Sequence, residues 1–169
     1  MGSEIYNPEK CIMPASRYLF QSERLGFRNW RPEDLEPMTT INRDPVVMEY
    51  FPSVATAADT AAFLERMQQQ FFDKGYCYFA VELLATSAFI GFIGLSEQNY
   101  DAYFTPCVDI GWRLDPRYWK QGFATEGARR CVQYAFEALN LLQIYAVAPS
   151  VNLNSIEVMK RIGMAPLQP

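Results

Sequence analysis

The segment DPRYWKQGFATEG, residues 115–127, decides the fold, because it joins a predicted strand to a predicted helix. The strand is CVDIGWRL (107–114), and Asp115-Pro116 ends it because proline cannot donate to a sheet ladder. The helix is predicted from about Gly122 to Leu139, where small and apolar residues recur at helical spacing. A strand that leads through a short loop into a helix N-terminus can present consecutive backbone N–H groups to an anion such as a pyrophosphate.

Small residues in this segment fit such a role. A larger side chain at Gly122 or Ala124 would push the backbone away from phosphate oxygens, and the Thr125 hydroxyl could donate one more hydrogen bond. The pattern G-x-A-x-x-G taken alone is equally compatible with an ordinary tight helix entry.

Upstream of this segment, the chain predicts a meander preceded by two helices. Residues 76–83 and 87–95 are rich in aromatic and β-branched residues and read as a hairpin, to which 107–114 adds a third strand. One helix starts near Pro32, and a capping box of Thr56 with Asp59 opens another.

Downstream, the almost continuous apolar run LLQIYAVA (141–148) predicts a strand with both faces covered, and a last helix is expected over about 154–162. The fold class is therefore α/β (α+β), with a mixed, mostly antiparallel sheet flanked by helices.

Length and composition predict one domain. The chain has 169 residues, half of them apolar, which suffices for one core; we expect an irregular arm over 1–16 and a single domain over 17–169. No apolar run is long enough to span a bilayer and no leader pattern opens the chain, so we expect no membrane association and a cytoplasmic location.

Charge and residue usage exclude several classes of function. The 15 Lys and Arg against 19 Asp and Glu give a net charge of −4, which disfavours nucleic-acid partners. Histidine is absent, so Ser-His and Cys-His nucleophile pairs are excluded. Four scattered cysteines, without a C-x-x-C pair, predict neither a metal site nor a disulfide framework; they are Cys11, Cys77, Cys107 and Cys131.

The sequence resembles the GNAT superfamily of N-acetyltransferases. Its pyrophosphate motif [QR]-x-x-G-x-[GA] is matched by residues 119–124 at both small positions, while Trp119 replaces the usual Gln or Arg. That departure is similar to the ribosomal-protein-alanine acetyltransferase-like branch, in which D-P-x-Y-W-x-x-G-x-A-T-E is common. Further resemblances follow the family's order; they are SERLGFRNWRPEDLEPM (22–38), NRDPVVMEYFP (42–52), FIGFIGL (89–95), DIGWRLDP (109–116) and NLNSIEVMKRIGM (152–164).

This resemblance implies the acyl-CoA N-acyltransferase fold, acetyl-CoA as co-substrate, no metal, and direct transfer of the acetyl group to a primary amine in a ternary complex. It implies that the strand end pairs its backbone with the pantetheine arm, that the loop amides hold the pyrophosphate, and that an Asn pair lies near the pantetheine. The implied cofactor-binding residues are Trp112, Arg113 and Leu114, then Trp119, Lys120, Gln121, Gly122, Phe123, Ala124 and Thr125, then Asn152 and Asn154.

For catalysis, the resemblance points to Asp109 as the base, directly or through water, with a strand amide near Trp112 polarising the carbonyl. Family members often have a tyrosine that protonates the leaving thiolate, but Met159 stands at that position, so Ser155 is the candidate replacement. Two weaker candidates for the base are Glu97 and Asp101.

The acceptor is an amine on a protein N-terminus or on a small molecule, and the sequence does not choose between them. Its binding wall is expected from the helices after Pro32 and Thr56 and from a loop that contains Tyr100, Tyr103 and Phe104. Family members continue with two more strands after the last helix, so C-terminal strands are expected to be missing from this chain. Dimers are common in the family, which makes a homodimer one expected form.

The same residues bear on two other classes of function. A dinucleotide-binding oxidoreductase needs an acidic residue at the end of the strand after the glycine-containing turn, and 141–148 ends in Ala148-Pro149 instead. A non-catalytic acyl-CoA-binding or sensor module of the same fold stays open as the alternative, because of Met159 and the absent histidines.

Overall fold

A computed structural model describes residues 16–167, so the arm predicted over 1–16 lies outside the described residues except for Ser16, and the predicted domain division stays a prediction. The elements in chain order are the strands β1 (Phe20–Gln21) and β2 (Leu25–Arg28), the 3-10 helix η2 (Pro32–Asp34), the helices α1 (Leu35–Arg43) and α2 (Ala57–Lys74), the strands β3 (Tyr78–Leu83), β4 (Phe89–Gln98) and β5 (Cys107–Leu114), the 3-10 helix η3 (Pro116–Tyr118), and the helices α3 (Phe123–Glu137) and α4 (Leu153–Arg161).

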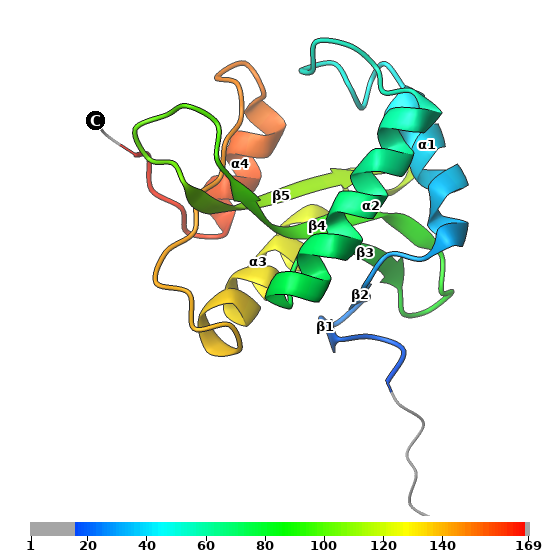
Figure 1. Ribbon diagram of the computed structural model, residues 1–169, viewed down its shortest axis with the longest axis horizontal. Helices are drawn as coiled ribbons and strands as arrows, with labels where there is room; N and C mark the ends of the chain where they lie inside the picture. The colour runs from blue at the N-terminus through cyan, green and yellow to red at the C-terminus, as the bar shows by residue number, and fades with distance from the viewer. Residues whose placement is uncertain (1–15, 168–169) are drawn as a thin grey trace, which may run out of the picture.

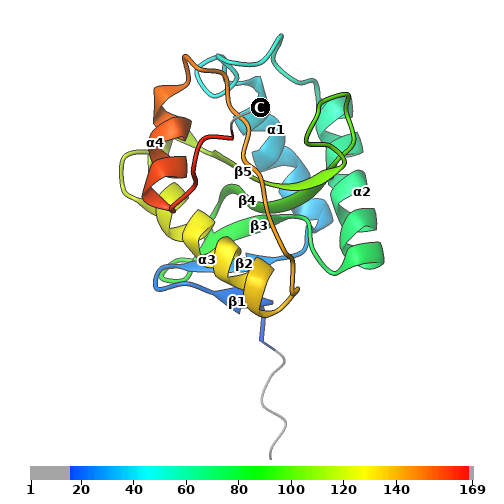
Figure 2. The same ribbon diagram turned by 90° about the vertical axis from the view of Figure 1, so that its left-hand side faces the viewer.

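The strands form one sheet in the order β1-β2-β3-β4-β5, and each neighbouring pair is antiparallel (Figure 1). The predicted meander is β3-β4-β5, in which Ile93 pairs with Trp112 and Gly91 with Leu114. Helices cover both faces: α3 and α4 lie on one side of the sheet, and α1 and α2 on the other (Figure 2). The predicted fold class, a mostly antiparallel sheet flanked by helices, is confirmed.

Local signals explain where the helices begin and end. Pro32 opens η2, and the Asp34 carboxylate accepts the Arg31 backbone N–H at 2.8 Å. In the predicted capping box, the Asp59 N–H donates to the Thr56 hydroxyl at 3.1 Å and the Thr56 N–H donates to the Asp59 carboxylate at 2.8 Å. Helix α2 then ends at Gly75, whose φ of 79° suits a residue without a side chain.

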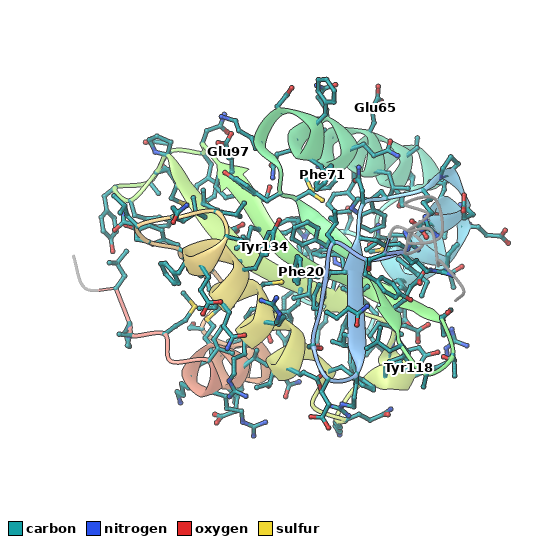
Figure 3. The ribbon with its side chains drawn as sticks, turned by 90° about the horizontal axis from the view of Figure 1, so that it is seen from below. Phe20, Glu65, Phe71, Glu97, Tyr118 and Tyr134 are labelled. Atoms are coloured by element: carbon teal, nitrogen blue, oxygen red, sulfur yellow. The ribbon has the colours of Figure 1, made fainter. Side chains whose placement is uncertain are left out.

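Aromatic rings and an ion cluster join the layers. Phe20 of β1 stacks on Tyr134 of α3 with ring centroids 4.2 Å apart, and Figure 3 shows these two rings side by side.

On the sheet, the guanidinium of Arg28 donates to both carboxylate oxygens of Asp34 at 2.7 Å and to Glu82 at 2.7 Å. All three residues of this cluster are at most 4% exposed. Because each charge has hydrogen-bonded partners, β2, β3 and η2 can share a buried polar junction.

The prediction of a strand over 141–148 is wrong. Within residues 16–167 this segment makes one isolated parallel bridge, between Tyr145 and Asp109 of β5, and Leu142 is 96% exposed. No strand among the described residues pairs with its outer side, and its apolar side chains are not covered on both faces. An apolar run forms a strand only where a neighbouring strand makes hydrogen bonds to its backbone groups. Here the neighbouring strand, β5, does so at one residue of the run, Tyr145.

Candidate active site

The segment around Tyr145 separates from β5 after one pair of contacts, which leaves an open sheet edge. Ile110 N–H donates to Tyr145 O at 2.7 Å, and Tyr145 N–H donates to Val108 O at 3.0 Å. In an antiparallel strand, the residues that bond to one side alternate with those that bond to the other. Trp112 and Leu114 therefore direct their backbone groups to the same side as Ile110, where the neighbouring segment has already diverged. An extended ligand can pair with such an edge.

Trp119 limits which of these edge groups are free. Its indole N–H donates to the Leu114 carbonyl at 2.8 Å, so the side chain that departs from the family motif ties the loop back onto β5. Beyond Ile110, the groups that remain for a ligand are the N–H and C=O of Trp112 and the N–H of Leu114. If residues 112–114 pair with a pantetheine arm as predicted, only these backbone groups are free to take part. The Arg113 side chain bonds to Asn42 of α1 instead.

The predicted anion cradle follows η3 directly. Lys120 and Gly122 both have left-handed backbone, with φ of 58° and 81°, and the first helical hydrogen bond of α3 runs from Glu126 N–H to Gly122 O at 3.0 Å. No backbone or side-chain acceptor within residues 16–167 bonds the N–H groups that precede it, at Gly122, Phe123, Ala124 and Thr125. Free amides at the positive end of a helix dipole suit a pyrophosphate, so the residues present fit that group.

An arginine far away in sequence holds the cradle in shape. Arg24, just before β2, donates from Nη1 to the Gln121 carbonyl at 3.0 Å and from Nε to Glu126 at 2.7 Å, and it lies over the Phe123 ring. Burial disfavours the charged form of Glu126, but hydrogen bonds from Ser22 and Arg24 outweigh it and lower the pKa of this carboxyl. Sequence reasoning missed Arg24, because no local pattern relates residues 102 positions apart.

Asp109, the predicted base, is 9% exposed and belongs to a short hydrogen-bonded chain. Its carboxylate accepts the Tyr78 hydroxyl at 2.6 Å, and Gln98 Nε2 donates to the same hydroxyl at 3.1 Å. The Tyr78 ring passes over Gly111, where a Cβ would come within 3.0 Å of it, so the glycine makes this approach possible. Burial raises the pKa of Asp109, and the hydrogen bonds lower it by less, so the carboxyl is a stronger base than an exposed one.

A cleft of about 880 Å³ lies beside this chain, on the side of the sheet that α2 covers. Its lining includes Tyr78 and Tyr145, which contact Asp109, and Gln98, which bonds to Tyr78. It also includes Glu97, which is labelled in Figure 3 and pairs with Lys74 at 3.3 Å. Of the two helices predicted to form the acceptor wall, α2 lines this cleft and α1 contributes nothing to its lining. The aromatic side chains of the predicted loop also lie outside the lining of the cleft. Phe104 stacks on Tyr145, whereas the other two, Tyr100 and Tyr103, are exposed. Asp101 of the same loop is exposed too.

The remaining predicted residues lie at the start of α4, on the opposite side of the sheet (Figure 2). Asn152 caps the helix, its side-chain oxygen accepting the Ser155 N–H at 3.1 Å, which leaves its amide nitrogen for a ligand. Asn154 is exposed, and Ser155 and Met159 are half-buried. Asp109 thus contacts Tyr78 on the side of the sheet that α2 covers, whereas Ser155 belongs to α4 on the other side.

Within residues 16–167, no three His, Cys, Asp or Glu side chains are grouped so that they could hold a metal ion. In the same part of the chain, no helix combines the length and the apolar character that crossing a bilayer requires.

A helix-flanked antiparallel meander, an open strand edge and an adjoining amide cradle together define a protein of the acyl-CoA N-acyltransferase type. The chain belongs to the GNAT acetyltransferase family, since the family model described as acetyltransferase (GNAT) domain matches residues 24–165. It is 31% identical to the uncharacterized N-acetyltransferase YnaD of Bacillus subtilis over 144 residues, which cover 85% of this chain and 80% of that protein.

Solved structures agree with this assignment. A GNAT acetyltransferase from Bacillus anthracis superposes with a TM-score of 0.72 at 28% identity, over 86% of this chain and 82% of that one. Spermidine N-acetyltransferase from Vibrio cholerae, solved with CoA and spermine, gives a TM-score of 0.66 at 23% identity, over 82% and 79%. The chain is thus an acetyl-transferring enzyme of this family.

Proposed function

We propose that this enzyme transfers the acetyl group of acetyl-CoA to a primary amine by direct attack in a ternary complex. The observation that carries the proposal is the juxtaposition of two sets of free backbone groups: the amides of 122–125 and the open edge of β5 at Trp112. The first set suits the pyrophosphate and the second suits the pantetheine arm of one extended ligand.

When bound, acetyl-CoA would supply a thioester whose C–S bond breaks as the C–N bond to the amine forms. The chain's own groups would do the rest. Asp109, with its raised pKa, takes a proton from the acceptor ammonium, and the freed lone pair attacks. The N–H of Trp112 donates to the carbonyl oxygen, where negative charge develops. The Ser155 hydroxyl donates to the leaving sulfur, and the second amine proton ends on the thiol.

A matched pair of glycine variants tests the donor site. Gly122→Glu places a carboxylate in the cradle, whereas Gly75→Glu makes the same change at a residue of nearly identical backbone conformation, with φ of 79° against 81°, at the end of α2. Titration calorimetry should show acetyl-CoA binding to the native chain and to Gly75→Glu, and at least a hundredfold weaker binding to Gly122→Glu, because a like charge faces the pyrophosphate. Equal binding to all three proteins would sink the donor assignment.

Release of free thiol over a panel of amines then separates the enzyme from a non-catalytic acyl-CoA-binding module. Turnover of at least one amine supports transfer, and binding without turnover of any amine favours the module. The ribosomal-protein acetyltransferase-like branch, a homodimer and a cytoplasmic location stay predictions, carried by the resemblance of 115–126 and by composition.

A further inference from the structure

Arg113 occupies the acceptor side of β5. Side chains alternate along a strand, so Arg113 shares a face with Gly111 and Asp109, the face that Tyr78 and α2 cover. It follows Trp112 directly, the residue whose N–H is proposed to polarise the carbonyl. The Cα atoms of Asp109 and Arg113 are four residues apart, about 13 Å along an extended strand.

The surroundings of Arg113 hold its guanidinium in one place. Its Nη1 donates to Asn42 Oδ1 at 2.7 Å, and the Asn42 amide nitrogen donates in turn to the Thr60 hydroxyl at 3.0 Å, which fixes the direction of the Asn42 oxygen. The guanidinium carbon lies 4.4 Å from the ring centroid of Phe51 and 5.4 Å from that of Phe92. A cation that is fixed by neutral partners and two aromatic rings is preorganised for a ligand.

No carboxylate among residues 16–167 pairs with Arg113, whereas Arg17, Arg24 and Arg117 each pair with one and Arg28 pairs with two. Burial lowers its pKa to about 10, which still leaves the group charged at neutral pH. Every fully buried side-chain nitrogen or oxygen in the described residues has a hydrogen-bond partner, so the N–H groups of Arg113 that lack one must reach accessible space. A largely buried cation without a counter-ion is electrostatically incomplete.

We propose that the acceptor is a small amine that also carries an oxyanion, a carboxylate or a phosphate, and that this anion pairs with Arg113. The inference rests on the proposed function. The planar guanidinium fork matches either oxyanion, whereas a polycation would be repelled by it. The side chains that line the neighbouring cleft carry no net negative charge to offset that repulsion, since Asp73 and Glu97 are balanced by Arg66 and Lys74. The carboxylate of Asp109 beside the cleft is assigned to the reacting amine, so it does not offset the further charges of a polycation.

The test compares amines that differ only in the anion. Amino acids and short ω-amino acids are paired with their carboxamides, and glucosamine 6-phosphate with glucosamine, and spermidine serves as an amine without an anion. Binding is measured by calorimetry with CoA present, and acetylation by thiol release. We expect the anionic member of at least one pair to bind roughly 10 to 100 times more tightly, as for a charge-assisted hydrogen bond. A preference confined to the carboxylate or to the phosphate pair identifies which oxyanion is read.

Variants assign that preference to Arg113. Arg113→Gln should reduce the ratio between the two members of a pair to near one, and Arg113→Lys, which keeps the charge, should retain part of it. Arg130→Gln removes another arginine that lies near an aromatic ring, Phe20, and donates to a neutral group, the Gln21 carbonyl. It belongs to α3 on the opposite side of the sheet, so the ratio should stay unchanged (Figure 2). A merely structural role would weaken binding of both members equally.

Equal binding of both members of every pair, binding of neither, or an unchanged ratio in Arg113→Gln overturns the inference. Failure of the proposed function looks different, because anionic amines would then bind through Arg113 without any thiol release.

Discussion

Replacing Tyr78 by phenylalanine should shift the pH dependence of catalysis in a direction that the structure fixes. The Tyr78 hydroxyl donates to Asp109 at 2.6 Å and thereby stabilises the ionised carboxylate. Burial already raises the pKa of Asp109. Without the hydroxyl, the charged form loses its donor, so the pKa must rise further, and the acidic limb of kcat/KM must move to higher pH if Asp109 is the base.

The size of the shift follows from the lost hydrogen bond. A hydrogen bond to a charged group contributes about 1.5 to 3 kcal/mol, and one pKa unit corresponds to about 1.4 kcal/mol. The acidic limb should therefore move upward by about 1 to 2 pH units, and kcat/KM on the plateau should change much less than at low pH.

The assay is thiol release, with kcat/KM measured at intervals across the acidic and neutral range. Tyr76→Phe is the matched control, because it removes a hydroxyl near the same cleft that contacts Glu97 at 3.5 Å rather than Asp109. Asp109→Asn should lower kcat by about 10²-fold to 10⁴-fold and abolish the limb. A limb that stays at the same pH in Tyr78→Phe, or that persists in Asp109→Asn, would refute Asp109 as the base.

Two further changes probe the supports of the site. Trp119→Phe removes the indole N–H that donates to the Leu114 carbonyl at 2.8 Å. The loss of about 1 kcal/mol should raise the acetyl-CoA Kd about fivefold. An unchanged Kd would mean that this contact does not position the loop. Glu82→Gln removes one of the two carboxylates that pair with buried Arg28, so the free energy of unfolding, measured in urea at pH 7, should fall by about 3 kcal/mol. The control is Glu65→Gln on the outer side of α2 (Figure 3), which should change it by less than about 0.5 kcal/mol. Burial opposes ionisation of Glu82, but its hydrogen bonds lower its pKa, so this stabilisation is present above the ordinary pKa of 4.5 and is lost as the pH falls through the lowered value.

The sequence by itself determined the features that depend on neighbouring residues. Thr56 and Asp59 cap α2, Asp115-Pro116 ends β5, and the helix entry at Gly122 exposes its amides, as predicted. Each of these signals acts within one turn or one strand end, where backbone hydrogen bonding and allowed φ values leave few alternatives. The meander, the layers and the location of the cradle followed from them.

Tertiary structure alone decided the partners of the charged groups. Tyr78 meets Asp109 across 31 residues, Asn42 meets Arg113 across 71, and Arg24 meets Glu126 across 102. The same holds for 141–148, where an apolar composition predicted a strand but only Tyr145 found a partner on β5. A strand's pairing, a carboxyl's pKa and a cation's counter-ion depend on what the folded chain brings alongside, and no spacing within the sequence encodes that neighbour.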